Sequence, residues 1–288
     1  MFKGKVGIIT GAGKGLGRAY ALYIGRRGGR VVVNNRARNG EDSAQTVVDK
    51  IIAAGGQAIV NHDPVEAEGA GERMVAAALD HYGQLDFVIN NAGVSEATMF
   101  HKQSLAAFKN IMDINLMGSI ALSHAAYKVM REAGAGRIIL SMSSAGLFGN
   151  HGGAAYSASK AGLYGFMRAL HVEAASRGVY TNAISPYGAT PMTAAYLPPD
   201  LCDRMSPDLV APLVAWLASD HCMVSGEVFV SGCGRLRHAR METSLVRDFP
   251  SDDPSPTEMT ELIRAVMASD CTARFENAQE DFANFIRS

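Results

Sequence analysis

The sequence predicts a doubly wound α/β fold built on a seven-stranded parallel sheet, with a helical extension at the C-terminal end. Two observations predict this fold. Short β-branched runs recur along the first 240 residues and are almost entirely apolar, as strands buried on both faces of a parallel sheet must be. Longer Ala-rich segments separate these runs, and each parallel crossover needs a helix to return the chain. Ligands of such a sheet bind beyond the carboxyl ends of its strands.

The strands and helices are predicted from these patterns in chain order. The predicted strands are VGIIT at 6–10, RVVVNN at 30–35, QAIVNH at 57–62, DFVINN at 86–91, RIILSM at 137–142, YTNAIS at 180–185 and EVFVSG at 227–232. The predicted helices are 18–27, 42–54, 68–81, 105–132 and 156–177.

The pattern ends near residue 240, so residues 1–245 are predicted to form the main domain and 246–288 an extension. The stretch RDFPSDDPSPTE is rich in Pro, Asp and Ser, like a linker. MTELIRAVMASD and AQEDFANFIRS after it have the spacing of one or two amphipathic helices. The extension could cover a substrate cleft, pack on a partner subunit or lie on the surface.

Composition excludes several classes of function. Charged residues make up 19% of the chain and the net charge is −1, which argues against nucleic acid as a ligand. No apolar run reaches the length of a membrane span or signal peptide, so a soluble, cytoplasmic protein is expected. The eight His residues form no metal-binding motif, and the four cysteines lie far apart, so no metal site is predicted. These cysteines are Cys202, Cys222, Cys233 and Cys271.

The first predicted strand runs directly into TGAGKGLGR, a glycine-rich turn before a helix. Gly11, Gly15 and Gly17 lack Cβ atoms, so the backbone can turn tightly and a pyrophosphate can approach the amide donors at the helix N-terminus. Lys14 and Leu16 lie within the same turn. This turn predicts a dinucleotide site, which makes residues 1–245 a dinucleotide-binding catalytic domain.

Tyr156 and Lys160 form a candidate acid/base pair. A secondary alcohol loses hydride only if its hydroxyl proton also leaves, and a phenol of pKa about 10 is a poor base at neutral pH unless a cation stabilises its phenolate. The i,i+4 spacing places both side chains on one face of a helix. Ser143 follows the fifth strand and is placed to hold a substrate oxygen.

The spacing T-G-x-x-x-G-x-G resembles the short-chain dehydrogenase/reductase family, and further motifs extend the resemblance over roughly residues 3–240. In order, the matching residues are Asp63, Asn90, Asn91, Ala92, Gly93, Asn115, Ser143, Tyr156 and Lys160. The resemblance implies a Rossmann-type fold in an enzyme that transfers hydride between NAD(P)(H) and a secondary alcohol or ketone.

The same resemblance implies roles for these residues. Tyr156 would be the acid/base, Lys160 would lower its pKa and bind the nicotinamide ribose, and Ser143 would orient the substrate. Asn115 would complete a proton relay through water, unless it only kinks or caps a helix. Asp63 would contact adenine, unless it is a turn residue before Pro64. The segment from Asn90 to Gly93 would line the cofactor cleft.

A loop after the sixth strand, SPYGATPMT, is where the family places a Pro and a Thr against the nicotinamide. Pro186 matches, whereas the glycine is displaced to Gly188. Either Thr190 or Thr193 could make the contact, and Thr190 is the predicted one.

The predicted cofactor is NADP(H), with NAD as the alternative. Enzymes that use NAD usually carry an acidic residue at the end of the second strand, whereas a 2'-phosphate needs positive charge there. Here Asn35 stands at that place, Arg36 and Arg38 follow, and Lys14 lies in the glycine turn. No carboxylate at position 35 repels a phosphate, and cations are available to bind it.

A second resemblance points to NAD and to the substrate. Several stretches look like the dehydrogenase portion of peroxisomal multifunctional enzymes of type 2, whose relatives oxidise (3R)-hydroxyacyl-CoA thioesters and some steroid alcohols and carry Asp where Asn35 stands. These stretches are GLGRAYAL, RVVVNN, FGNHGGAAYSASKAGL, LVAPLVAWL and ARFENAQ. The resemblance implies lipid metabolism and a 3-hydroxyacyl thioester or steroid-like substrate.

Two functional hypotheses follow from the sequence. The first is an oxidoreductase acting on a small-molecule substrate, and the second is a dinucleotide-binding redox sensor without turnover, which is expected where the Tyr or Lys is lost. A homo-oligomer is predicted because helices 105–132 and 156–177 are apolar on more than one face. The family resemblance implies that they pair across a two-fold axis, in a homodimer or homotetramer.

Overall fold

The computed structural model describes residues 1–37, 41–194, 197–270 and 272–287. Its chain divides into two compact units, Met1–His238 and Ala239–Ser288. The predicted boundary at residue 245 falls inside the second unit. The assignment of residues 1–245 as the catalytic domain and of 246–288 as an extension stays a prediction. Arg38 and Cys271, singled out from the sequence, lie outside the described residues. Nowhere in the described ranges is there a helix with the length and apolar character needed to span a bilayer.

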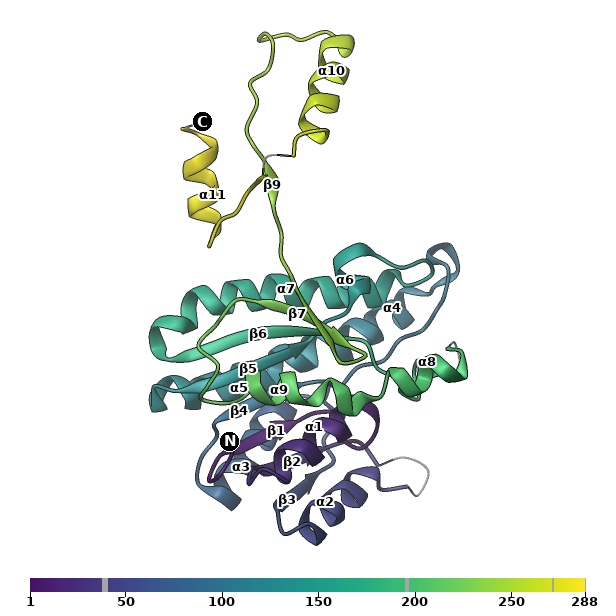
Figure 1. Ribbon diagram of the computed structural model, residues 1–288, viewed down its shortest axis with the longest axis vertical. Coiled ribbons are helices and arrows are strands. Elements are labelled where there is room, and N and C mark those ends of the chain that lie inside the picture. Colours follow the sequence, from purple (N-terminus) through teal and green to yellow (C-terminus); the bar gives the residue numbers. More distant parts are fainter. Residues whose placement is uncertain (38–40, 195–196, 271, 288) are drawn as a thin grey trace. The chain divides into compact units, whose positions relative to one another are not determined.

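The first unit is organised around one sheet of strand order β3-β2-β1-β4-β5-β6-β7-β8 (Figure 1). Every pair from β3 to β7 is parallel, which confirms the predicted doubly wound sheet of seven parallel strands. The order reverses at β1 and β4, which makes the carboxyl ends of these two strands the expected ligand crevice. The strands are β1 Val6–Ile9, β2 Arg30–Asn34, β3 Gln57–Asn61, β4 Phe87–Asn90, β5 Gly136–Ser141, β6 Val179–Pro186, β7 Val228–Gly232 and β8 Arg235–Ala239.

Strand β8 was not predicted from the sequence. It follows β7 after only Cys233 and Gly234, whose φ values of 53° and 68° are those of a tight hairpin turn. So short a connection can only join antiparallel strands. Four of the five β8 residues are exposed, and two of the four are arginines, which suits an edge strand. The sequence signal failed because an exposed edge strand lacks the apolar run that identified the other seven.

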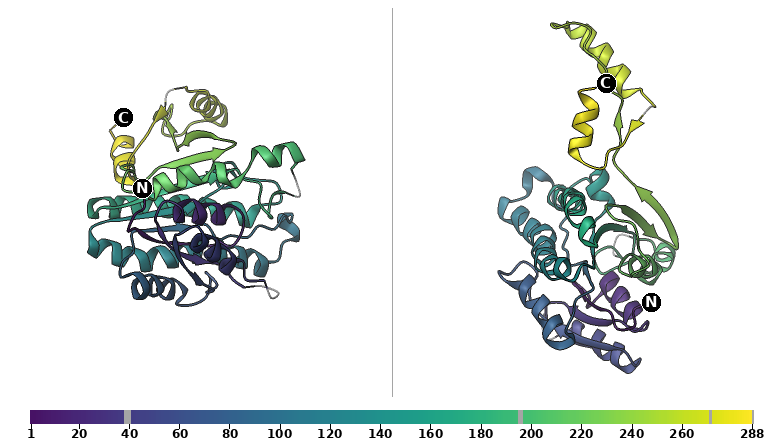
Figure 2. Two further views of the ribbon diagram at one scale, coloured as in Figure 1. Left: turned by 60° about the horizontal axis from the view of Figure 1, so that its bottom comes forward. Right: turned by 90° about the vertical axis from the view of Figure 1, so that its left-hand side faces the viewer.

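Helices cover both faces of the sheet (Figure 2). Helices α1, α2 and α9 contribute with β1, β2 and β4 to the principal apolar core, whereas α3 packs on α5 on the other side. The helices of this unit are α1 Gly15–Gly25, α2 Ser43–Ala53, α3 Ala70–Tyr82, α4 Leu105–Met112, α5 Gly118–Ala133, α6 Ser144–Phe148, α7 Ala154–Ala174, α8 Pro199–Arg204 and α9 Ala211–Leu217.

The single helix predicted over 105–132 is interrupted. A π-helical segment, Asp113–Met117, separates α4 from α5. The buried side chain of Asn115, in the middle of this segment, accepts a hydrogen bond from Val94 N (2.8 Å) and donates one to Val94 O (2.9 Å). A widened turn of this kind is typical of functional positions. Asn115 thus lies at an irregular turn of the helix and makes long-range hydrogen bonds.

In the described residues of the second unit, two short strands and two helices are found. Strands β9 Thr243–Ser244 and β10 Thr272–Ala273 pair antiparallel, and the helices are α10 Pro256–Met267 and α11 Ala278–Phe285. Ser255 and Glu258 form a reciprocal capping box that begins α10. Glu242 holds the unit together through ion pairs with Arg240 and Arg274, both at 2.7 Å. The sequence predicted one or two amphipathic helices here, and two are present, α10 and α11.

Candidate active site

The glycine-rich turn TGAGKGLGR joins β1 to α1 and lies next to the carboxyl end of β4. Gly11 and Gly15 have φ values of 62° and 54°, a region that favours glycine. A Cβ on Gly17 would lie 2.5 Å from Gly11 O, and one on Gly11 would lie 2.9 Å from Ala92 Cα. Helix α1 starts at Gly15 without a side-chain cap or an acidic residue in its first turn. Its free N–H groups therefore suit an anion, and the absence of Cβ atoms lets that anion come close.

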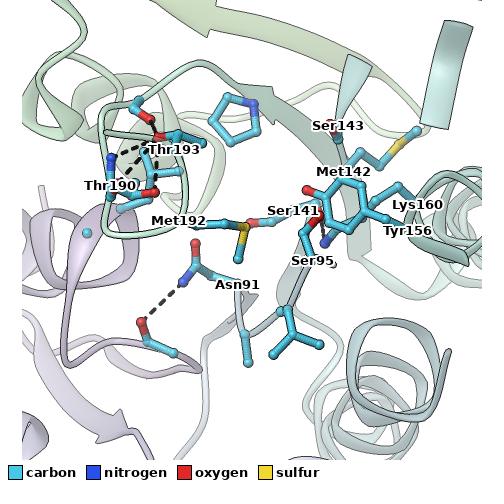
Figure 3. A pocket seen from close by; sticks show the side chains of 18 of the residues that line it. Asn91, Ser95, Ser141, Met142, Ser143, Tyr156, Lys160, Thr190, Met192 and Thr193 are labelled. Atoms are coloured by element: carbon cyan, nitrogen blue, oxygen red, sulfur yellow. Dashed lines mark hydrogen bonds between the residues drawn. The ribbon is translucent and has the colours of Figure 1, made fainter. Parts of the chain in front are cut away.

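A cavity of about 820 Å³ extends from this turn along the carboxyl ends of the strands. Figure 3 shows Asn91 on the side of the glycine turn and Tyr156, Lys160 and Ser143 at the opposite end. The sequence-predicted residues that line the cavity are Gly11, Lys14, Gly15, Leu16, Asn35, Arg36, Asp63, Asn91, Ala92, Gly93, Ser143, Tyr156, Lys160, Pro186 and Thr190. Gly17, Asn90 and Asn115 are not among the lining residues and support the wall from behind.

Ser143 and Tyr156 are brought together by β5, α6 and α7. Ser143 is the N-cap of α6, where its Oγ accepts from Ala145 N at 3.2 Å. Its side chain also lies beside that of Tyr156, whose phenol is largely buried. A short turn after a strand and the first turn of the next helix thus place two hydroxyls side by side at the end of the cavity.

Lys160 lies one helical turn beyond Tyr156 and is 4% exposed. Its Nζ donates to Ser141 O at 2.7 Å and lies 5.6 Å from the centroid of the Tyr156 ring. A Cβ on Gly93 would be 3.5 Å from Lys160 Nζ, so the close approach of the chain after β4 encloses the ammonium. No carboxylate of the described chain forms an ion pair with Lys160.

Burial shifts the pKa values of Lys160 and Tyr156 in the directions that favour their uncharged forms. It lowers the pKa of Lys160 from 10.5 to about 8, because little water remains to solvate the ammonium. It raises the pKa of Tyr156, which the hydrogen bond from Ser143 partly offsets by stabilising the phenolate. The sequence predicted that Lys160 would lower the pKa of Tyr156. The contact that lowers it against the effect of burial is the one with Ser143.

Asn115 and Ser159 connect the π-helical segment to the Tyr156 helix. Asn115 Nδ2 donates to Ser159 Oγ at 3.1 Å, and Ser159 Oγ donates to Tyr156 O at 2.7 Å. The side chain of Asn115 is fully buried and its bonds run to protein atoms, so it fixes the position of the first turn of α7. Ser159 was not singled out from the sequence, because a small residue beside Lys160 carries no spacing signal of its own.

The loop after β6 places Thr190 against the glycine turn. Thr190 Cγ2 lies 3.0 Å from a Cβ built on Gly15, and both Thr190 and Thr193 line the cavity. The hydroxyl of Thr193 is engaged within the loop, where it accepts from Thr190 N at 3.0 Å and donates to Gly188 O at 2.8 Å. Of the two threonines, Thr190 therefore has the hydroxyl with fewer ties to the main chain of the loop.

Several cavity residues near Tyr156 escaped the sequence analysis because they belong to no motif. They come from the segments after β4 and β5 and from the loop after β6, and they are mainly small or apolar. They include Val94, Ser95, Ala97, Met142, Asn150 and Met192. Their only sequence signal is that they directly follow residues that were predicted.

At the other end of the cavity, the cations proposed for a 2'-phosphate are paired with carboxylates. Arg36 Nη1 lies 2.7 Å from Glu66 Oε1, with side chains 30% and 23% exposed. Lys14 Nζ lies 2.8 Å from Glu41 Oε2 in a more exposed pair. Asn35 Nδ2 donates to Ser43 Oγ at 2.9 Å, so the amide is anchored at the start of α2.

Asp63 is likewise held by several groups at the end of β3. Arg73 Nε donates to Asp63 Oδ1 at 2.6 Å, and Asn61 Nδ2 donates to Asp63 Oδ2 at 2.8 Å. Asn34 Nδ2 donates to Asp63 O at 2.9 Å. Asp63 is therefore an anchored cavity residue rather than only a turn residue before Pro64.

A free helix N-terminus at one end of a long cavity and a buried proton-transfer pair at the other define a class of protein. The first feature fits the pyrophosphate of a dinucleotide and the second fits proton transfer to or from an oxygen atom. This class is the α/β oxidoreductases that use a nicotinamide dinucleotide. No cluster of three or more potential metal ligands is found among the described residues.

The chain belongs to the short-chain dehydrogenase family, whose model, described as "short chain dehydrogenase", matches residues 5–200. The sequence-based resemblance to this family is therefore confirmed. As a member, the protein is an NAD(P)-dependent oxidoreductase that acts on CH–OH groups.

Two curated relatives show how far the likeness extends. The "peroxisomal multifunctional enzyme type 2" of Mus musculus is 39% identical over 250 residues, 85% of this chain but 34% of that enzyme. The chain thus spans about a third of the length of this relative. The "3-oxoacyl-[acyl-carrier-protein] reductase" of a Synechocystis strain is 35% identical, over 78% of this chain and 94% of the reductase.

A solved structure agrees with the fold. The crystal structure of a short chain dehydrogenase from Mycobacterium avium matches with a TM-score of 0.83 and 33% identity, over 92% of this chain and 95% of the other.

Proposed function

We propose that this protein interconverts a 3-hydroxyacyl thioester, or a related steroid-like secondary alcohol, and its ketone with NADP(H), as a step of lipid metabolism. The observation that carries the proposal is the Tyr156 and Ser143 hydroxyl pair beside the buried Lys160, in one cavity with the glycine turn. The names of two relatives, a 3-oxoacyl reductase and a peroxisomal multifunctional enzyme, support an acyl substrate.

The proton-transfer step follows from the positions of the two hydroxyls. Ser143 Oγ is placed to donate a hydrogen bond to the substrate oxygen and to hold it beside Tyr156 Oη. In ketone reduction, Tyr156 Oη gives its proton to that oxygen, and in alcohol oxidation the phenolate takes the hydroxyl proton. A protonated Lys160 near the phenol favours the phenolate. The bound dinucleotide supplies or accepts the hydride.

The walls of the cavity near Tyr156 support an acyl chain as the group next to the reacting carbon. Val94, Ala97, Met142 and Met192 present small or apolar side chains to the cavity. Methionine side chains adapt to unbranched chains of different length. These residues would hold the substrate by apolar contact while Ser143 fixes its oxygen.

The remaining predicted residues are proposed to hold the dinucleotide. Gly11, Gly15 and Gly17 would admit the pyrophosphate, with Lys14 and Leu16 in the same turn. The adenosine half would contact Asn35, Arg36 and Asp63. Asn91, Ala92, Gly93, Pro186 and Thr190 would contact the nicotinamide half, together with Lys160, and Asn115 would support the wall behind them.

The choice of NADP(H) over NAD(H) rests on the end of β2. Asn35 carries no charge, and the guanidinium of Arg36 lines the cavity. A charge-assisted pair with a phosphate at a partly exposed site contributes about 1 to 3 kcal/mol, or about tenfold to a hundredfold in binding. Arg36→Ala should therefore raise KM for NADPH by about that factor and change KM for NADH little.

Turnover measurements test the proposed reaction directly. A panel of β-ketoacyl thioesters and cyclic ketones would be assayed with NADPH and with NADH separately, following loss of reduced-nicotinamide absorbance. Faster turnover of the thioesters with NADPH is expected. Turnover confined to cyclic ketones would contradict the acyl substrate, and a preference for NADH unaffected by Arg36→Ala would contradict the cofactor assignment.

The assembly and location are part of the same proposal. We propose a cytoplasmic homodimer or a homotetramer of such dimers, since apolar side chains are exposed at the start of α4 (Leu105, 81%) and at the break between α4 and α5 (Met117, 52%). A monomer in light scattering at micromolar concentration would contradict the assembly. Recovery in an organelle fraction would contradict the location.

A further inference from the structure

Arg36 stands between the cavity and a carboxylate that does not reach the cavity. Arg36 lines the cavity, whereas Glu66 does not, although their side chains meet at 2.7 Å. The second carboxylate oxygen, Glu66 Oε2, is buried and has no hydrogen-bond partner in the described part of the chain. Among the described residues, the ion pair of Glu66 is therefore with Arg36, and the carboxylate that makes it lies outside the cavity lining.

Glu66 is held in this place by the loop between β3 and α3. Its neighbour Val65 is 7% exposed and packs against Gly118, where a Cβ would lie 2.8 Å from Val65 Cγ2. Arg73 ties both ends of the loop, with Nε on Asp63 at 2.6 Å and Nη1 on Glu68 O at 2.9 Å. The carboxylate thus approaches Arg36 from a fixed backbone.

We propose that Glu66 sets the selectivity of this site between phosphorylated and unphosphorylated ribose. It holds the Arg36 guanidinium at the cavity wall and compensates part of its charge. The inference rests on the proposed function, in which Arg36 faces the 2'-phosphate. One guanidinium N–H is used by Glu66 and others remain for a phosphate. The carboxylate behind them weakens the attraction for an anion, so the site discriminates less strongly than an unpaired arginine would.

Two ligands separate this effect from hydride transfer. Adenosine 2',5'-bisphosphate and 5'-AMP differ by the 2'-phosphate and contain no nicotinamide, so their binding by calorimetry reports on the ribose site alone. Glu66→Gln keeps an oxygen that accepts from Arg36 and removes the charge. Its affinity for the bisphosphate should rise about threefold to tenfold, with 5'-AMP unchanged within about twofold.

Two further variants test the two parts of the inference. Glu66→Ala removes the acceptor as well as the charge, so its gain should be smaller than that of Glu66→Gln. Glu68→Gln is the matched control, because it removes the same charge two residues along the loop from an exposed side chain. It should leave both affinities within about twofold of the wild-type values.

The outcomes distinguish this inference from the proposed function. An unchanged or reduced bisphosphate affinity in Glu66→Gln, with 5'-AMP binding intact, would overturn the role of Glu66. An equal gain in Glu66→Ala would overturn its holding of Arg36. If Arg36→Ala leaves bisphosphate binding unchanged, the cofactor assignment fails instead, whatever Glu66→Gln does. Binding of 5'-AMP reports in every variant that the site is folded.

Discussion

The two ends of the cavity treat positive charge in opposite ways. At the Tyr156 end, Lys160 is 4% exposed, and its ammonium contacts a main-chain oxygen rather than a carboxylate. At the end proposed to hold the adenosine ribose (the ribose end), three cations are each paired with a carboxylate. Their side chains are between 30% and 51% exposed. These pairs are Lys14 with Glu41, Arg36 with Glu66, and Arg73 with Asp63.

The difference suits two functions, proton transfer at one end and binding of an anion at the other. A buried amine without a counterion has a proton affinity set by its surroundings, which suits proton transfer. A paired and partly hydrated cation stays charged and can exchange contacts with an anionic ligand. The affinity of such a cation for an anionic ligand then depends on the carboxylate that is paired with it. Because the two ends differ in this way, a substitution at one end should leave the other end largely unaffected.

The largest expected effect is at the Tyr156 end. Tyr156→Phe removes the hydroxyl that exchanges a proton with the substrate and should lower kcat at least about a hundredfold, since positioned acid/base groups contribute 10²- to 10⁴-fold. Dinucleotide affinity should change little, because the ribose end is untouched. Steady-state turnover and a separate fluorescence titration with NADPH measure the two quantities.

Tyr164→Phe is the control for this variant. Tyr164 lies on the same helix α7 but does not line the cavity. It should keep near-normal turnover. Near-normal turnover in Tyr156→Phe as well would remove the assignment of Tyr156 as the acid/base.

The second prediction concerns the pH dependence of stability. Burial lowers the pKa of Lys160 to about 8, whereas in the unfolded chain it returns to 10.5. Between these two values the unfolded state binds the proton more strongly, so this group makes the protein more stable as pH rises. The gain over that window is of the order of 3 kcal/mol and is absent below the folded pKa, where both states are protonated.

Denaturant unfolding of the wild-type protein and of Lys160→Met across this pH window measures the effect. Other groups also titrate there, but the contributions of those remote from Lys160 are common to both proteins. The free energy of unfolding of the wild type should therefore rise relative to that of Lys160→Met. A constant difference between the two would show that Lys160 is solvated, and the contrast between the two ends of the cavity would disappear.

The catalytic end was largely predictable from the sequence because its residues are linked by short spacings. Tyr156 and Lys160 are one helical turn apart, and Ser143 follows an unmistakable buried strand. The seven parallel strands were predicted for a similar reason, since each contains a short run of mostly apolar, β-branched residues. Strand β8 was missed because an exposed edge strand needs no such run.

The ribose end could not be predicted to the same depth, because its electrostatics depend on contacts far apart in the sequence. Asn35 and Arg36 were identified from their place after the second strand, but Glu66 lies 30 residues from Arg36 and belongs to no motif. The break in the helix at Asn115 is similar. Its cause is hydrogen bonding to Val94, 21 residues away, which no helical periodicity reveals.

The third prediction adds charge at the ribose end. Asn35→Asp places a carboxylate where the 2'-phosphate would lie, and the same carboxylate can accept from ribose hydroxyls. The ratio of kcat/KM for NADPH to that for NADH should fall about tenfold, while kcat with NADH stays near the wild-type value. Asn35→Ala, which also loses the bond to Ser43 but adds no charge, should not favour NADH. An equal shift in both variants would indicate a loss of packing rather than repulsion.

The smallest effect is expected for Lys14→Gln, and it compares two cations at the same end. Lys14 is 51% exposed and its partner Glu41 is 62% exposed, so water and salt screen this charge, and exposed pairs contribute only about 0 to 1 kcal/mol. Arg36 is 30% exposed, and its planar donors can bind a phosphate bidentately. KM for NADPH should therefore rise less than about threefold in Lys14→Gln, against about tenfold or more in Arg36→Ala. The effect of Lys14→Gln should also fade at high salt sooner than that of Arg36→Ala, because the more exposed charge is screened more completely. If Lys14→Gln instead proves the more damaging change, the phosphate lies nearer the glycine turn than the end of β2, and Glu41 rather than Glu66 is the carboxylate that tempers its binding.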